Sequence, residues 1–133
     1  MKYLLDTNIC IYIIKKRPAQ VLKRLMRQPI ERVAISSITL SELEYGVEKS
    51  AHKDRNRLAL AGFLSPLAIL PYDDHAAAAY GKIRAYLEKE GVAIGPLDML
   101  IGAQAMSHKN ILVTNNDREF ARVPGLNVEN WCN

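Results

Sequence analysis

The feature that most constrains the fold of this chain is the alternation of short apolar runs with longer stretches of helical periodicity. Short apolar runs bounded by polar or turn-forming residues are typical of buried strands. The pattern predicts strands at residues 3–5, 33–36, 67–70 and 111–113, and a further edge strand at 126–128. Because helical stretches separate the strands, we expect an α/β fold with a mostly parallel sheet of four or five strands flanked by helices.

The helices are predicted from apolar residues at helical spacing and from capping residues at the segment ends. The predicted helices cover residues 9–14, 19–26, 38–49, 55–64, 74–90 and 96–108. Asp73 or Asp74 is expected to cap the long helix, which stops at Gly91, and Pro96 begins the last one.

The composition favours one globular domain over residues 1–133. Hydrophobic residues make up 49% and charged residues 24% of the chain. The formal net charge of +4 permits a nucleic-acid partner without requiring one. Cys10 and Cys132 lack the spacing of a metal site, and Asp6 interrupts the N-terminal apolar stretch too early for a signal peptide. We therefore expect a cytoplasmic protein with reduced thiols and no membrane contact.

Polar residues follow two of the predicted strands. Asp6-Thr7-Asn8 comes after the first strand, and Thr114-Asn115-Asn116-Asp117 comes after the fourth. In a parallel sheet both clusters open at the same edge, where ligands of α/β proteins bind. An Asp in this position is most often a helix N-cap, but Thr7 and Asn8 can cap equally well, which leaves Asp6 partly unexplained.

Two further acids lie in apolar surroundings on predicted helices. Asp98 is the stronger signal, because a lone charge within residues 94–102 is costly unless it is paired or binds a metal. Its place after Pro96 also suits the helix dipole. Glu42 taken alone fits a solvated helix face, and the competing Glu44 faces away from it.

Together, these carboxylates predict a site for a hard cation. Asp6, Glu42 and Asp98 can converge at one edge of a parallel sheet, and clustered carboxylates repel unless a cation neutralises them. Oxygen ligands suit Mg²⁺ or Mn²⁺. Asn115 and Asn116 are either turn residues or polar contributors to that site. The histidines offer no zinc set, and we interpret all three as surface or capping residues: His52, His75 and His108.

Four segments of the chain, in order and at suitable spacing, resemble the motifs of the PIN-domain ribonucleases, and in particular the VapC-like toxins of VapBC toxin–antitoxin systems. These segments are Leu4–Asn8, Ser36–Gly46 with Glu42 at the acidic position, Pro96–Ala103 with Asp98 acidic, and Val113–Phe120. The closing stretch from Val123 to Trp131 also resembles the VapC tail. The similarity spans essentially the whole chain.

The resemblance implies a dimeric PIN-like nuclease domain with an acidic Mg²⁺ pocket, in which Mn²⁺ is a possible substitute. In that pocket Asp6, Glu42 and Asp98 would hold the metal, while Thr114 and Asn116 would position a metal-bound water or the scissile phosphate. The metal would activate the water for in-line attack on RNA, leaving a 5′-phosphate and a 3′-hydroxyl. The implied partners are a VapB-like antitoxin and an RNA substrate, with tRNA favoured, and operator DNA is contacted only through the antitoxin.

The last motif departs from the family pattern at one position. Many PIN domains carry an Asp where this chain has Asn116, which offers a carbonyl oxygen but no charge. Asp117 and Glu119 lie nearby and can substitute, with Asp117 ranked lower because it points differently if the backbone stays extended. The lost charge argues against a tightly held second metal.

Basic residues crowd one N-terminal segment, in which Glu31 is the only acid. This basic segment contains Lys15, Lys16, Arg17, Lys23, Arg24, Arg27 and Arg32. It is either a solvated helix face or a surface for the RNA backbone or an antitoxin tail.

Two alternatives stay open at this point. A phosphotransferase of the haloacid-dehalogenase type also begins with a strand that ends in Asp, but it requires a second Asp where this chain has Asn8. A catalytically silent PIN-type domain that binds RNA or protein is supported by Asn116 and opposed by the three retained acids.

Overall fold

The computed structural model describes residues 2–133, and its elements alternate between strands and helices as the sequence pattern predicts. The strands are β1 (Tyr3–Leu5), β2 (Val33–Ser36), β3 (Ala68–Leu70), β4 (Ile111–Val113) and β5 (Val128–Glu129). The helices are α1 (Thr7–Lys15), α2 (Ala19–Met26), the 3₁₀ turn η1 (Ile30–Arg32), α3 (Ser37–Glu48), α4 (Lys53–Leu64), α5 (Asp74–Glu90), α6 (Pro96–Ser107) and α7 (Asp117–Phe120).

The strands form one five-stranded sheet in the order β3-β2-β1-β4-β5, and every pairing is parallel. The α/β class and the parallel sheet are therefore confirmed. The edge strand lies at Val128–Glu129 rather than at 126–128. It lies there because Asn127 and Glu129 supply the carbonyls that accept from the N–H groups of Leu112 and Thr114.

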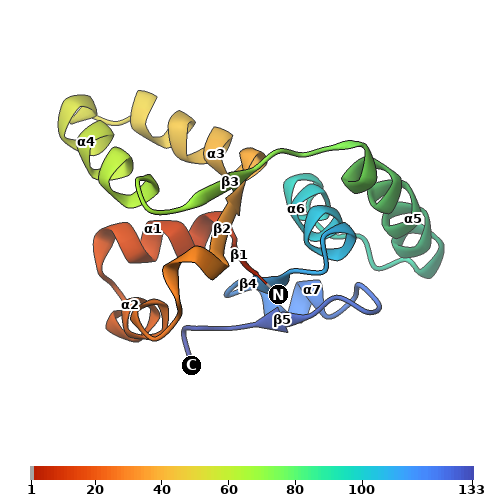
Figure 1. The fold of residues 1–133 in the computed structure, drawn as a ribbon. Coiled ribbons are helices and arrows are strands. Elements are labelled where there is room, and N and C mark those ends of the chain that lie inside the picture. Colours follow the sequence, from red (N-terminus) through yellow and green to blue (C-terminus); the bar gives the residue numbers. More distant parts are fainter. Residues whose placement is uncertain (1) are drawn as a thin grey trace.

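Helices cover both faces of the sheet (Figure 1). Figure 1 shows α1 to α4 on one side and α5 and α6 on the other. Strand side chains alternate between these layers, as the pleat requires. Leu4 packs in the core with α5, α6 and α7, whereas Leu5 packs in the core with α1 to α4.

The strand order places a change of direction at the centre of the sheet. From β1 the chain builds outward through β2 and β3, and then crosses to β4 and β5 on the other side. β1 and β4 are neighbours in the sheet, but the chain continues from β1 into α1 and from β4 into α7. In open α/β sheets this point, at the carboxyl ends of the strands, is where ligands bind.

Trp131 anchors the C-terminal tail beside the first strand. Its ring is buried and lies 5.4 Å from the ring of Tyr3, centroid to centroid. Its indole N–H donates to Glu129 Oε1 at 3.0 Å. The tail thereby secures the outer strand β5, which has a partner on one side only.

Candidate active site at the carboxyl edge of the sheet

Asp6 lies at the centre of this edge, directly after β1. Its backbone N–H donates to Val113 O at 3.0 Å, which continues the pairing with β4 by one step. Its carboxylate caps α1, with Oδ1 accepting from Ile9 N at 3.0 Å. The capping role that the sequence shared among Asp6, Thr7 and Asn8 thus belongs to Asp6.

Burial leaves the Asp6 carboxylate poorly solvated. The side chain is 4% exposed, and burial raises the pKa of this carboxyl above its ordinary value. The Thr114 hydroxyl accepts from Asn116 N at 2.9 Å and donates to Asp6. That hydrogen bond and the cap oppose the effect of burial, and the charge of Glu42 reinforces it.

Glu42 reaches the same edge from α3. Thr7 Oγ1 donates to Glu42 Oε1 at 2.6 Å, so the residue after Asp6 holds the second acid. Sequence reasoning missed this bond, although the place of Thr7 in the Asp6-Thr7-Asn8 cluster could have suggested it. Glu44 lies elsewhere and pairs with Arg57 at 3.1 Å, as the prediction that it faces away requires.

Asp98 lies in the first turn of α6, two helical positions after Pro96 begins the helix. It is partly buried, and its pKa is raised to about 6. Burial is the largest cause, followed by the charges of Glu119, Asp6 and Glu42 in that order. The three predicted acids therefore act on one another electrostatically.

Glu119 is the fourth acid of this group. It lies in α7, and its Oε1 accepts from Gly95 N at 3.2 Å, directly before α6 begins. Its charge is the largest electrostatic contribution to the raised pKa of Asp98. Glu119 was a secondary candidate in the sequence. In the structure its charge raises the pKa of Asp98 more than the charge of Asp6 or Glu42 does.

The other residues of the last motif point elsewhere. Asn116 is exposed, and its side chain makes no capping bond at the start of α7. Asp117 accepts from Asn130 Nδ2 at 3.4 Å, toward the C-terminal tail. Asp117 was ranked lower on the condition that the backbone stays extended, and the backbone instead turns into α7 at this residue.

Asn115 bonds to α1 and forms a polar rim beside the acids. Its Nδ2 donates to the Tyr12 hydroxyl at 3.1 Å, and its Oδ1 accepts from Asn8 Nδ2 at 3.5 Å. These bonds connect the loop after β4 to the helix after β1.

The four acids of this group form no ion pair with a basic side chain in the part of the chain that the structure describes. Within residues 2–133, none of the ion pairs involves the four acids, which are Asp6, Glu42, Asp98 and Glu119. In the same residues, no three Asp, Glu, His or Cys side chains are arranged tightly enough to enclose a metal ion. The donor chemistry fits a hard divalent cation, because unbalanced oxygen ligands are what Mg²⁺ prefers.

The histidines lie outside this acidic group. His52 and His75 are exposed, and His108 follows the last turn of α6, where its Nε2 lies 3.1 Å from Asp73 Oδ2. Asp73 is also the N-cap of α5, which fixes the choice between Asp73 and Asp74.

The basic segment divides into anchored and free residues. Arg24 pairs with Glu129 at 3.5 Å and lies 5.9 Å from the Trp131 ring centroid, so it holds the C-terminal tail. Arg32 lies over the Tyr3 ring at 5.6 Å. Arg32 is nevertheless exposed, as are the remaining members, Lys15, Lys16, Arg17, Lys23 and Arg27.

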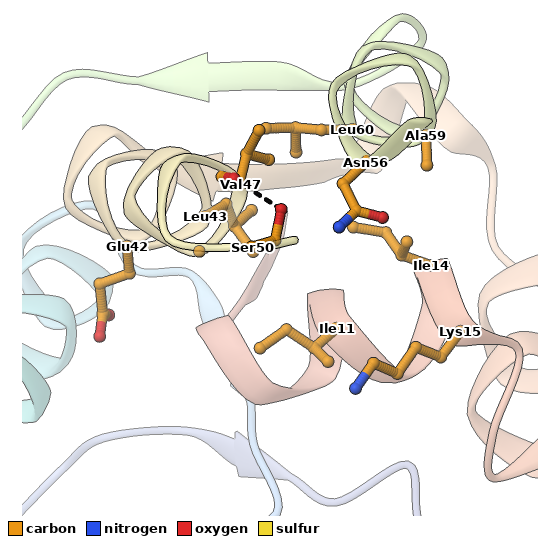
Figure 2. Close-up of a pocket in the computed structure, with 11 residues that line it drawn as sticks. Ile11, Ile14, Lys15, Glu42, Leu43, Val47, Ser50, Asn56, Ala59 and Leu60 are labelled. Carbon is orange, nitrogen blue, oxygen red and sulfur yellow. Dashed lines mark hydrogen bonds between the residues drawn. The ribbon is translucent and has the colours of Figure 1, made fainter. Parts of the chain in front are cut away.

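A hollow of about 350 Å³ lies next to the acidic group, between α1, α3 and α4. Figure 2 shows Glu42 at one end of this α1–α3–α4 groove, with Ile11 and Ile14 of α1 facing Leu60 of α4 across it. Lys15 lies at its α1 border. The groove is mostly apolar and ends at an acid of the site.

These features agree with the comparisons with known proteins. The family model described as the PIN domain matches residues 3–126. The chain belongs to the PIN-domain family. It is 50% identical over 131 residues to "Ribonuclease VapC2" of Haemophilus influenzae, with 98% of each chain covered. It is 46% identical over 132 residues to the "tRNA(fMet)-specific endonuclease VapC" of Salmonella typhimurium, with 99% of each covered. The crystal structure of DNA-bound VapBC from Salmonella typhimurium matches with a TM-score of 0.93 at 46% identity, covering 99% of each chain.

The comparisons confirm the expected class, a VapC-type ribonuclease toxin of a toxin–antitoxin system. Membership of the PIN-domain family excludes the haloacid-dehalogenase alternative, and the ribonuclease relatives oppose a silent domain. PIN-domain nucleases of this type are typically metal-dependent. Among residues 2–133, no helix has the length and apolar character to cross a membrane.

Proposed function

We propose that the chain is a Mg²⁺-dependent endoribonuclease toxin whose catalytic group is Asp6, Glu42, Asp98 and Glu119. The observation that carries this proposal is the gathering of four carboxylates from separate parts of the chain, where the charges of Glu119, Asp6 and Glu42 all act on Asp98. Within residues 2–133 none of the four takes part in an ion pair. Such an arrangement is unfavourable on its own and becomes favourable once a divalent cation neutralises it. The proposal covers the whole nuclease domain, residues 1–133.

In this mechanism Asp6, Glu42 and Asp98 would hold Mg²⁺, or Mn²⁺ in its place, and Glu119 would complete the acidic shell. The bound ion would supply an activated water and neutralise charge on the scissile phosphate. Thr7 and Thr114 orient the Glu42 and Asp6 carboxylates through hydrogen bonds. Asn116, exposed at the rim, is available to contact the phosphate.

We propose tRNA as the substrate. The Salmonella relative, 46% identical, carries the name of a tRNA(fMet)-specific endonuclease. The exposed residues of the basic segment suit the RNA backbone, because phosphates attract Lys and Arg without regard to sequence. Arg24 is less suited to that role than its neighbours, because it already pairs with Glu129.

We further propose a VapB-like antitoxin as the partner, docking in the α1–α3–α4 groove. The groove is mostly apolar and ends at Glu42, so a segment that fills it would also reach the acidic group. The Salmonella structure is of a DNA-bound VapBC complex, which favours contact with operator DNA through the antitoxin. The protein would act as a homodimer. It would act in the cytoplasm, where tRNA is present.

The test is incubation of purified, antitoxin-free protein with total bacterial tRNA in Mg²⁺, Mn²⁺ or EDTA. We expect discrete fragments that need metal and carry 5′-phosphates. Glu42→Gln and Glu44→Gln form a matched pair on one helix. The first should abolish cleavage, and the second should leave it intact, because Glu44 pairs with Arg57 away from the site.

Cleavage that persists in EDTA, or full activity of purified Glu42→Gln, would contradict the proposed metal site. Absence of cleavage of any tRNA by folded wild-type protein that does bind Mn²⁺ would leave the metal site in place and overturn the substrate.

A further inference from the structure

One fully buried polar side chain of α6 is not explained by the catalytic group. Gln104 is 0% exposed, and its amide points to the carboxyl ends of β2 and β3. Its Nε2 donates to Leu70 O at 2.9 Å and to Pro71 O at 3.3 Å. Its Oε1 accepts from Ser36 Oγ at 2.6 Å. An amide buried among apolar groups is tolerated only when it is bonded in this way.

The partner hydroxyl joins two further elements. Ser36 is the last residue of β2 and the N-cap of α3, and its Oγ accepts from Ile38 N at 2.9 Å. The Ser36 hydroxyl therefore accepts a hydrogen bond from the first turn of α3 and donates one to Gln104 of α6. Ser36 is itself 0% exposed, so water does not compete for either bond.

The two helices that meet at this bond carry two of the acids. Glu42 lies on α3 and Asp98 lies on α6. Asp6 follows Leu5, which is in register with Ile35, the residue before Ser36. The elements that bear Asp6, Glu42 and Asp98 thus come together at the Ser36–Gln104 bond.

The Ser36–Gln104 hydrogen bond opposes the mutual repulsion of the acids. Without a cation, the charges on Glu42 and Asp98 favour separation of α3 from α6. Apolar contacts between the helices are non-directional and allow sliding or rotation, whereas hydrogen bonds fix both.

We infer that Ser36 and Gln104 are positioning residues, which set the separation of the Glu42 and Asp98 carboxylates and so keep the metal site assembled before the ion binds. This role rests on the proposed function. A purely structural role is the competing explanation, and α6 offers a comparison for it. His108 is the C-cap at the other end of the same helix, and its side chain binds Asp73, the N-cap of α5, which carries none of the four acids.

The experiment measures Mn²⁺ binding to the purified protein without RNA, by calorimetry, beside thermal melting and the kcat/KM for tRNA. The variants are Ser36→Ala, Ser36→Thr, Gln104→Met, the double variant Ser36→Ala/Gln104→Met, and His108→Ala as the control. Ser36→Ala and Gln104→Met break the bond from opposite sides, so each keeps the test valid if the other fails to fold.

We expect Ser36→Ala and Gln104→Met each to weaken Mn²⁺ binding by about tenfold. This is the lower end of the range found when direct partners of metal ligands are removed, because these two side chains act on the ligands only through α3 and α6. Ser36→Thr keeps the hydroxyl and should restore binding to within about threefold of wild type. The double variant should bind Mn²⁺ about as weakly as Gln104→Met, because the Ser36–Gln104 bond that the two changes share is already absent in Gln104→Met. His108→Ala should lower the melting temperature while leaving Mn²⁺ affinity within about twofold of wild type.

Folded Ser36→Ala and Gln104→Met that bind Mn²⁺ as wild type does would overturn the positioning role. So would an equal loss of affinity in His108→Ala, since that would show general destabilisation. If wild-type protein neither binds Mn²⁺ nor cleaves tRNA, the proposed function itself fails, and the positioning role fails with it.

Discussion

At the scale of single residues, the acids of the site are held at the expense of stability. Asp98 has a pKa of about 6 because it is partly buried and lies in the field of Glu119, Asp6 and Glu42. A carboxyl with a raised pKa in the folded state favours folding when protonated and opposes folding when charged. Under the proposed function, activity and stability therefore make opposite demands on this residue.

Asp98→Asn should accordingly stabilise the metal-free protein while abolishing cleavage. A shift from 3.8 to about 6 corresponds to about 3 kcal/mol at full weight, which solvent screening at this partly exposed group reduces to about 1 kcal/mol. The Asp98 penalty is absent below the unfolded pKa and complete above the folded pKa. Thermal melts in EDTA should show the variant about 3 °C more stable at pH 7.5, and the difference should shrink to about 1 °C at pH 4.5. An equal or lower melting temperature for the variant at pH 7.5 would contradict the assigned pKa.

Thr7 offers a second prediction at the same scale. Thr7→Val keeps the shape of the side chain and removes the hydroxyl that donates to Glu42 at 2.6 Å. We expect the kcat/KM for tRNA to fall about tenfold, because a carboxylate without its orienting donor binds metal less well. Thr7→Ser keeps the donor and should stay within about threefold of wild type. If Thr7→Ser lost as much activity as Thr7→Val, the hydroxyl would not be the reason.

At the scale of elements, the short helix α7 determines which residue of the last motif joins the acids. The turn of α7 carries Glu119 to the start of α6 and directs Asp117 to Asn130 in the tail. Two acids of the same helical turn, Asp117 and Glu119, therefore have different hydrogen-bond partners.

Glu119→Gln and Asp117→Asn test this difference with the same change of charge on the same helix. We expect Glu119→Gln to lower kcat/KM by about tenfold to a hundredfold, because it removes the charge that acts most strongly on Asp98. Asp117→Asn should change it by less than about twofold. A larger loss in Asp117→Asn would show that α7 rearranges when substrate or metal binds.

At the scale of the whole molecule, basic and acidic residues are separated. The exposed cations of the basic segment lie on or next to α1, α2 and η1, while the acids gather at the carboxyl edge of the sheet. The formal net charge of +4 is too small to attract RNA strongly, so the local arrangement has to do so.

Salt dependence of RNA binding measures this arrangement. In an Asp98→Asn background, which does not cleave, Lys23→Gln/Arg27→Gln should lower tRNA affinity and reduce the slope of log affinity against log salt by about 1.5. The control is Lys82→Gln/Lys89→Gln on α5, which removes two exposed lysines on the opposite side of the sheet. Equal effects of the two pairs would mean that only overall charge matters.

The sequence by itself determined the fold class and indicated three acids, Asp6, Glu42 and Asp98, whose charges the structure brings together. Apolar runs and caps such as Asp73 are local signals, and they fixed the parallel sheet and nearly all of its elements. Asp98 was identified because a charge in an apolar stretch needs a physical reason wherever the chain folds.

Only the tertiary structure decided which neighbours complete the site. Glu119 rather than Asp117 joins the acids, Thr7 holds Glu42, and Arg24 serves the C-terminal tail instead of a free surface. The Ser36–Gln104 bond links residues far apart in the sequence. No local pattern predicts such contacts, because they depend on the register of β1 with its neighbours and on how α3, α6 and α7 pack.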